Sequence, residues 1–180
     1  MKQVKEMSIG ELAAFVCSFL LANGIKCILT GGACVSIYTE NKYQSFDLDF
    51  IEEPDVKRSE LKKLLSQIGF EEKNRYFINN DTEFFIEFPS GPLSAGSEPI
   101  TNHNELTYET GKLLLLTPTD SVKDRLAAFY HWDDKQALEQ AIWIAENHKI
   151  DINEIKRWSE VEGKSEKFNL IKHDLRSKII

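Results

Sequence analysis

Cysteine is scarce in this chain of 180 residues. The three cysteines, Cys17, Cys27 and Cys34, are an odd number and lack the paired spacing of a zinc site. All three lie among apolar residues, so we expect reduced, buried thiols of a cytoplasmic protein and no disulfide framework. Long apolar runs are lacking as well, because no stretch is long enough to span a membrane.

Positive charge is also in short supply. The chain has 22 Lys and Arg against 29 Asp and Glu, a net charge of −7. Binding to duplex DNA depends on basic residues that neutralise phosphates, so we do not expect it. Residues 148–180 carry eight basic and six acidic residues. This mildly basic tail favours a solvated helix surface, although it leaves contact with a tRNA end open.

The composition, 42% apolar and 28% charged, is typical of a globular protein with a sizeable core. Apolar periodicity, caps and turn residues predict helices and strands along the whole chain. The expected helices are 8–22, a short helix after Gly31-Gly32 that reaches about residue 39, then 54–68, 117–131, 133–147, 151–159 and 164–176. The expected strands are 26–29, 46–51, 75–78, 83–88 and 113–116.

The first helix follows Lys2 and Lys5 and contains an apolar run that superficially resembles a signal peptide. Ser8 and Glu11 form a capping box before it and Asn23-Gly24 forms a stop after it, which favours a buried helix. Segment 89–99 (PSGPLSAGSEP) is rich in Gly, Pro and Ser and predicts a loop that either contacts substrate or only joins two strands.

The element order predicts an α/β (α+β) fold, in which a mixed sheet flanked by helices is followed by a helical C-terminal extension. We expect the α/β core to cover 1–117 and the helical region to cover 118–180 and to pack on it. Trp158 and Phe168 of the helical region are expected to be core anchors.

Asp47 and Asp49 are two residues apart in a predicted strand, so their side chains point to the same face. Two carboxylates on one face repel each other unless a cation lies between them, and Mg²⁺ prefers such oxygen ligands. Upstream, Gly31-Gly32 lets the backbone approach a phosphate, and the helix that follows offers its N–H groups. The alternative is an acidic edge strand beside a pair of turn glycines.

Gly31-Gly32, the intervening helix and the segment SFDLDF at 45–50 resemble the signature of the nucleotidyltransferase superfamily, which has the DNA polymerase β-like fold. This resemblance implies that Gly31, Gly32 and Ser45 bind the phosphates of a nucleoside triphosphate. It also implies that Asp47 and Asp49 hold Mg²⁺, in a two-metal site. A third carboxylate is expected on a later strand, where Glu87 within FFIEF is the match and Glu83 is a rival.

The segment TPTDSVKDRL at 117–126 is similar to the helix after the catalytic core of small bacterial nucleotidyltransferases of the abortive-infection and toxin–antitoxin type. Lys123 matches a lysine that meets the triphosphate, and Asp133 and Asp134 match a later acidic segment. Arg125 is two residues from Lys123, so the two cannot share one helix face. The alternative, which stays open, is that both are surface charges on an amphipathic helix. His131 is expected to cap a helix junction, with an acid–base role as the alternative.

These observations predict a Mg²⁺-dependent transfer of a nucleoside monophosphate to a hydroxyl acceptor. The acceptor is a tRNA end, a protein side chain or a small molecule. Phosphoryl transfer would use the same metal site. The other hypothesis is a catalytically inactive binding module with this fold, or one component of a toxin–antitoxin pair with a cognate antitoxin-type protein.

Overall fold

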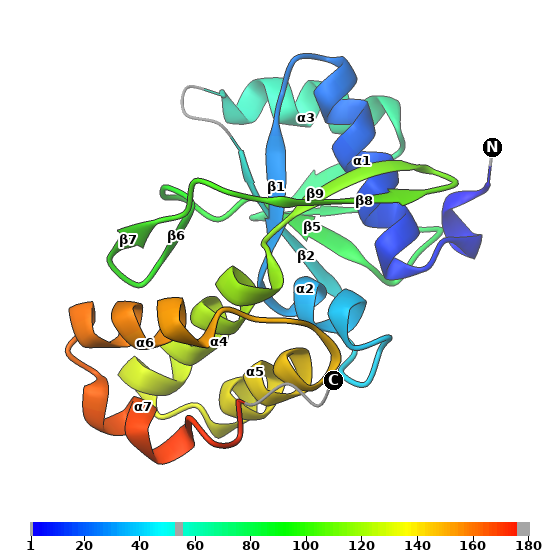
Figure 1. Cartoon of the computed structure of the whole chain (residues 1–180). Helices are drawn as coiled ribbons and strands as arrows, with labels where there is room; N and C mark the ends of the chain where they lie inside the picture. Colours follow the sequence, from blue (N-terminus) through cyan, green and yellow to red (C-terminus); the bar gives the residue numbers. More distant parts are fainter. Residues whose placement is uncertain (1, 53–55, 176–180) are drawn as a thin grey trace.

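The computed structural model describes residues 2–52 and 56–175 and contains a seven-stranded mixed sheet with helices packed around it (Figure 1). A 3₁₀ turn (Val4–Glu6) precedes the α-helices, which are α1 (Ile9–Ala22), α2 (Gly31–Tyr38), α3 (Arg58–Gln67), α4 (Pro118–Trp132), α5 (Lys135–Asn147), α6 (Ile152–Val161) and α7 (Ser165–Ile171). The strands are β1 (Cys27–Thr30), β2 (Asp47–Glu52), β3 (Glu71–Lys73), β4 (Tyr76–Ile78), β5 (Phe85–Glu87), β6 (Ser94–Ala95), β7 (Glu98–Pro99), β8 (Asn104–Tyr108) and β9 (Gly111–Leu115). This architecture confirms the predicted fold class.

The strand order in the main sheet is β3-β4-β5-β2-β1-β9-β8. Strand β2 is antiparallel to β1 and parallel to β5, and β1 is parallel to β9. The strands that carry the predicted site carboxylates, β2 and β5, are therefore neighbours inside the sheet.

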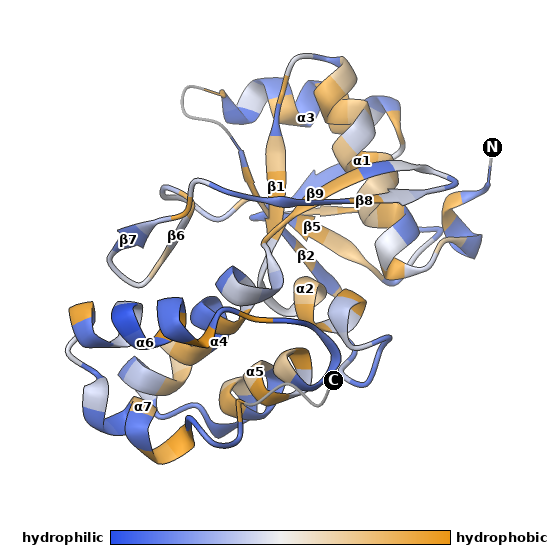
Figure 2. Cartoon of the chain, viewed as in Figure 1, coloured by the Kyte–Doolittle hydropathy of each residue, from blue (hydrophilic) through white to orange (hydrophobic). Residues whose placement is uncertain are grey.

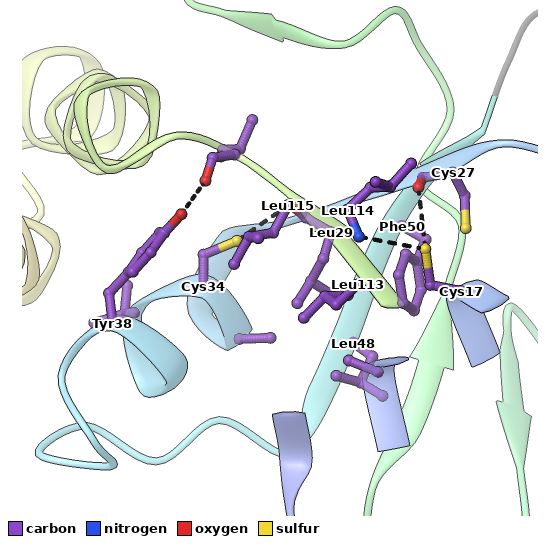
Figure 3. Close-up of a cluster of buried hydrophobic side chains, with 14 of the residues drawn as sticks. Cys17, Cys27, Leu29, Cys34, Tyr38, Leu48, Phe50, Leu113, Leu114 and Leu115 are labelled. Carbon is purple, nitrogen blue, oxygen red and sulfur yellow. Dashed lines mark hydrogen bonds between the residues drawn. The ribbon is translucent and has the colours of Figure 1, made fainter. Parts of the chain in front are cut away.

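One face of the sheet supports the core and is apolar along its central strands. Its fully buried side chains include Leu29, Leu48, Phe50 and Leu113, which pack with residues of α1 and α2 (Figure 3). Apolar residues accordingly concentrate along β1, β5 and β9, whereas hydrophilic residues line the outer surfaces of the helices (Figure 2). Burial of apolar area is the main driving force for this packing.

The three cysteines belong to this core and are free and buried, as predicted. The Cys17 thiol donates to the carbonyl of Cys27 over 3.6 Å, and the Cys34 thiol donates to the carbonyl of Leu29 over 3.1 Å. The thiols of Cys17 and Cys34 thus satisfy their weak donors inside the fold.

Helices α4 to α7 form a second block that meets the sheet through α2, which contacts both α4 and α5 (Figure 1). At this junction the Tyr38 hydroxyl donates to the carbonyl of Leu116 over 2.5 Å. Trp158 and Phe168 are buried, which confirms that they are core anchors. One cluster of buried side chains continues through both blocks, and the division of the chain at residue 117 stays a prediction.

Segment 89–99 is not the plain loop that its composition predicts. It contains the two-stranded hairpin of β6 and β7, which packs on the helical block. The Trp158 indole N–H donates to the carbonyl of Ala95 over 3.0 Å, and the Ser97 N–H donates to Glu162 Oε1 over 2.7 Å. The hairpin depends on these contacts with α6, which are distant in sequence.

Several boundaries differ from those predicted. Helix α3 begins at Arg58, and the expected start at 54–55 lies outside the described residues. Helix α7 ends at Ile171, because 172–175 form turns, and Arg176 lies outside the described residues. Strand β5 is three residues long instead of six, and β3 and β8 are additional strands.

The predicted caps are present where short polar side chains can bond the first turn of a helix. Ser8 and Glu11 form the expected capping box of α1. At the α4–α5 junction, Asp133 has the left-handed φ of 56° and ends α4, so α5 begins after Asp134 and not at Asp133. Within residues 2–52 and 56–175, every helix is too short or too polar to cross a lipid bilayer.

Candidate active site

Asp47 and Asp49 lie on the sheet face opposite the core. Burial alternates along β2, with Leu48 and Phe50 fully buried and the two aspartates partly exposed. The period of two therefore places both carboxylates on the same face, as the sequence predicts.

Glu87 is the neighbour of Asp49 in the sheet. Strands β2 and β5 are parallel, and their register pairs Asp49 with Glu87 and Asp47 with Phe85. Glu83 lies in a bend before β5 and is exposed. The structure thus brings Glu87, and not Glu83, next to the two aspartates, while the role of Glu87 stays a prediction.

Gly31 brings the start of α2 against Asp49. Its φ of +65° favours glycine, and a Cβ atom on it would lie 2.6 Å from Asp49 Oδ2. The side chain of the N-cap residue Thr30 does not cap α2, because its hydroxyl donates to the carbonyl of Asp49 over 3.2 Å. The first-turn N–H groups of α2 are therefore left for another acceptor, and the helix dipole favours an anion there.

Ser45 is buried and connects α2 with Asp47. Its N–H donates to the Ser36 hydroxyl over 2.8 Å, and its own hydroxyl donates to the carboxylate of Asp47. Gly32 lies against it, since a Cβ on Gly32 would be 3.1 Å from Ser45 Oγ. In this arrangement Ser45 orients Asp47, and its predicted contact with phosphate stays a prediction.

The surroundings of Asp49 disfavour the charged form of its carboxylate. Burial raises its pKa to about 7, and the charges of Asp47 and Glu87 add to the shift, while the charge of Arg125 opposes it. Among the described residues, no side chain or backbone group donates a hydrogen bond to this carboxylate. A cation beside Asp49 would offset both the cost of burying this carboxylate and its repulsion by Asp47 and Glu87.

Arg125 lies beside Asp49, a position that the sequence interpretation did not assign to it. Its side chain is only 21% exposed and forms an ion pair with Asp124, with 2.5 Å between Nη2 and Oδ2. Burial lowers its pKa, but the charge of Asp124 and the hydrogen bond with it raise the pKa overall. Of the two alternatives for Arg125, the exposed surface charge is therefore the wrong one.

Arg125 lines a cavity of 230 Å³ together with Asp49, Gly31, Asp124 and Ser94. Thr30, Ile51 and Leu116 from the sheet and Pro89, Pro92 and Leu93 from the following segment complete its wall. The cavity thus combines two carboxylates, one guanidinium and a helix N-terminus.

Lys123 lies elsewhere. Its ammonium group forms ion pairs with Asp120 at 3.4 Å and Glu154 at 3.0 Å, and its side chain is 7% exposed. It lines a separate cavity of 370 Å³ with Glu98 and Arg157. The structure does not bring Lys123 together with the aspartates, so its contact with the triphosphate stays a prediction.

The acidic segment after α4 has capping contacts. Asp134 accepts from the N–H of Ala137 at the start of α5, and Asp133 forms an ion pair with Lys167 at 3.1 Å. His131 lies 3.4 Å from Glu162, at the helix junction where a capping role was predicted. None of these contacts reaches the Asp49 cavity.

A second, mostly apolar cavity of 490 Å³ continues from the Asp49 cavity. The two share Ile51, Pro92 and Leu93. The rest of its wall consists of Lys26, Ile28, Glu52, Gly91 and Ile100. A hydrophobic space beside a cluster of charged groups is typical of a small-molecule site.

The carboxylates suit a hard divalent cation in chemistry and register. As the side chains stand, however, no three His, Cys, Asp or Glu residues among the described ones form a group that could hold a metal ion. Glu87 forms an ion pair with Arg75, with 3.2 Å between Oε1 and Nε. The carboxylates of Asp47 and Asp49 have the donor chemistry for such a cation, and Glu87 would join them after it leaves Arg75.

No protein-family model matches the chain, and no curated protein sequence is significantly similar to it. Two solved structures have a similar fold. One is an antigenic nucleotidyltransferase-like protein from Paracoccidioides brasiliensis, which is 11% identical with a TM-score of 0.63 over 93% of this chain and 91% of that chain. The other is the antibiotic-resistance factor ANT(2'')-Ia, also 11% identical, with a TM-score of 0.52 over 92% of this chain and 95% of that chain. These similarities show that the chain has a nucleotidyltransferase-like fold.

Proposed function

We propose that this protein is a Mg²⁺-dependent nucleotidyltransferase that transfers a nucleoside monophosphate from a nucleoside triphosphate to a hydroxyl acceptor. One observation carries the proposal: Asp47 and Asp49 share a strand face, and an oxygen of Asp49 lies against Gly31 at the uncapped start of α2. Metal ligands and an anion-binding helix terminus thus meet at one point, as the chemistry of a metal-bound triphosphate requires.

In this proposal, Asp47 and Asp49 hold the metal, and Ser45 keeps Asp47 oriented. Bound Mg²⁺ would polarise the phosphate and stabilise the charge of the leaving oxygen. The N–H groups of Gly31 and Gly32 seat the terminal phosphates. Lys123 would have to leave its ion pairs to reach them, so we assign the cationic contact to Arg125, which already lines the cavity.

The acceptor oxygen attacks the α-phosphorus, and the bond from this phosphorus to the bridging oxygen of the β-phosphate breaks. A monophosphate ester forms and pyrophosphate leaves. Glu87 serves as the base that takes the hydroxyl proton. In the alternative, Glu87 would be a third metal ligand and the proton would pass to solvent water.

The direction of attack follows from the order of groups along β2. Gly32 and Ser45 lie at the start of the strand, Asp49 in the middle and Ile51 beyond it. If pyrophosphate leaves toward Gly32, in-line attack comes from the side of Ile51, where the apolar cavity opens. We assign this cavity to the acceptor, whether it is a small molecule, a protein side chain or a tRNA end.

Titration calorimetry with the four ribonucleoside triphosphates, with Mg²⁺ and with EDTA, tests the proposal. We expect binding that requires Mg²⁺ and is lost in Asp47→Asn and Asp49→Asn. Glu83→Gln removes the same charge outside the site and is the matched control. Wild-type binding in either aspartate variant would refute the assignment.

The ion pair between Glu87 and Arg75 favours a second function, a binding module that has this fold but lacks transfer activity. Such a module would bind a triphosphate or a cognate protein and leave the α-phosphate intact. Release of pyrophosphate in the presence of an acceptor would eliminate it. Relation to the abortive-infection and toxin–antitoxin type rests on segment 117–126 and remains a proposal.

A further inference from the structure

Arg75 lies in the turn between β3 and β4, after Asn74, which has a φ of 58°. The ladder between β4 and β5 pairs Tyr76 with Glu87, so the residue before Tyr76 lies next to Glu87. The guanidinium reaches the carboxylate with 3.2 Å between Nε and Oε1.

The position of Arg75 is fixed by other contacts. Its Nη2 donates to the Tyr76 hydroxyl over 2.6 Å, and its guanidinium lies 4.8 Å from the centre of the Tyr76 ring. Its carbonyl accepts from Arg58 Nη2 over 2.7 Å, and Arg58 is held in turn by Glu72 at 2.9 Å. The turn therefore holds Arg75 where it can reach Glu87.

Three carboxylates are adjacent in the sheet, but they do not share the same partners. The register places Glu87 beside Asp49, yet its carboxylate is bound to Arg75. We infer that Arg75 competes with the divalent cation for Glu87 and is a positioning residue that weakens binding of the cation. The inference rests on the proposed function, because it concerns the same metal site.

The competition is a weak one. The side chain of Arg75 is 69% exposed and that of Glu87 is 16% exposed, and an ion pair with an exposed partner contributes little to stability. Asp47 and Asp49 can therefore accept the cation first, and Glu87 joins when it leaves Arg75. An easily broken pair allows this exchange in each catalytic cycle, whereas a buried pair would block it.

Binding of Mn²⁺ alone to the full-length protein tests the inference, with free Mn²⁺ measured by electron paramagnetic resonance at low ionic strength. Arg75→Gln should bind Mn²⁺ about threefold more tightly than the wild type, the size expected from loss of an exposed pair. Arg75→Lys, which can keep the ion pair, should bind like the wild type. Lys112→Gln is the matched control, because it removes an exposed cation paired with Glu105 at the other edge of the sheet.

The double variant Arg75→Gln/Glu87→Gln identifies the ligand involved. We expect the gain in Mn²⁺ affinity to disappear when Glu87 is replaced. Equal affinity in the wild type and Arg75→Gln, or a gain that Lys112→Gln reproduces or that persists without Glu87, would overturn the inference and leave the proposed function standing. Absence of Mn²⁺ binding from both the wild type and Arg75→Gln would overturn both.

Discussion

Two charged regions begin two residues apart on α4 and differ in how their charges are paired. Around Lys123, the residues Asp120, Glu154, Arg157 and Glu98 form a continuous network of ion pairs. Hydrogen bonds from Arg157 and Lys123 lower the pKa of Glu154 to about 2. Around Arg125, burial and neighbouring carboxylates raise the pKa of Asp49 to about 7.

The two regions therefore differ in whether their charges are compensated within the protein. The network around Lys123 satisfies its members and fastens the β6–β7 hairpin to α6. The cavity around Asp49 leaves carboxylates near one another, and a metal-free protein bears that repulsion in its folded state. Unrelieved repulsion beside a helix N-terminus is the property that points to a ligand.

The largest effect on stability is expected at the hairpin anchor. Trp158→Ala should lower the free energy of unfolding by about 3–5 kcal/mol, because the indole is fully buried and stacks on Tyr130. Urea denaturation measures the loss, and Trp132→Ala, at a side chain that is 78% exposed, is the control. A similar loss in both variants would contradict the anchoring role.

Asp49→Asn should instead raise the free energy of unfolding of the metal-free protein. The pKa of Asp49 is raised from 3.8 to about 7, so its contribution to stability is complete below pH 3.8 and is lost as the pH rises through 7. At pH 8.5 in EDTA the variant should gain about 2 kcal/mol over the wild type, and less at pH 5.5. Urea denaturation at both pH values, with Glu83→Gln as control, measures this, and an equal gain at both would exclude the titration of Asp49.

Arg125 and Lys123 of α4 can be replaced one at a time to compare their effects on triphosphate binding. Arg125→Gln should weaken binding of Mg²⁺-triphosphate about tenfold, as expected for loss of a largely buried charge-assisted contact. Lys123→Gln should leave this affinity close to that of the wild type and lower stability. Titration calorimetry measures the triphosphate affinity of both variants. Weaker binding in Lys123→Gln and unchanged binding in Arg125→Gln would support the triphosphate role that the family resemblance assigns to Lys123.

The smallest effect is expected at Glu154. The pKa of Glu154 is lowered from 4.5 to about 2 in the folded protein. Glu154 therefore stabilises the fold at pH values above 4.5, and this contribution is lost as the pH falls toward 2. Glu154→Gln should cost about 0.5–1 kcal/mol at pH 7, since the pairs are partly exposed, and less at pH 3. Chemical denaturation at the two pH values checks this against Glu160→Gln, and a larger loss at pH 3 would contradict the pairing.

The parts of the fold and of the candidate site that the sequence predicted are those set by local geometry. Alternation along a strand places Asp47 and Asp49 on one face, and the Ser8–Glu11 capping box begins α1. Both follow from residues within one element, whose period or cap is independent of the rest of the fold.

The parts that sequence did not predict depend on distant contacts. The choice between Lys123 and Arg125 is made by α6, whose Glu154 binds the lysine. Strand β3 has no apolar alternation, since its residues are Glu71, Glu72 and Lys73, and it exists because β4 pairs with it. The β6–β7 hairpin likewise needs Trp158, more than fifty residues away.

The composition of β3 has a consequence for self-association. Strands β3 and β8 are the two edges of the main sheet and expose backbone groups to which another chain could add. Three consecutive charged side chains on β3 and exposed Glu105 and Thr107 on β8 make such strand addition unfavourable. The charged residues of β3 give it no apolar alternation by which a strand could be predicted. The same charges protect the edge of the sheet from pairing with another chain.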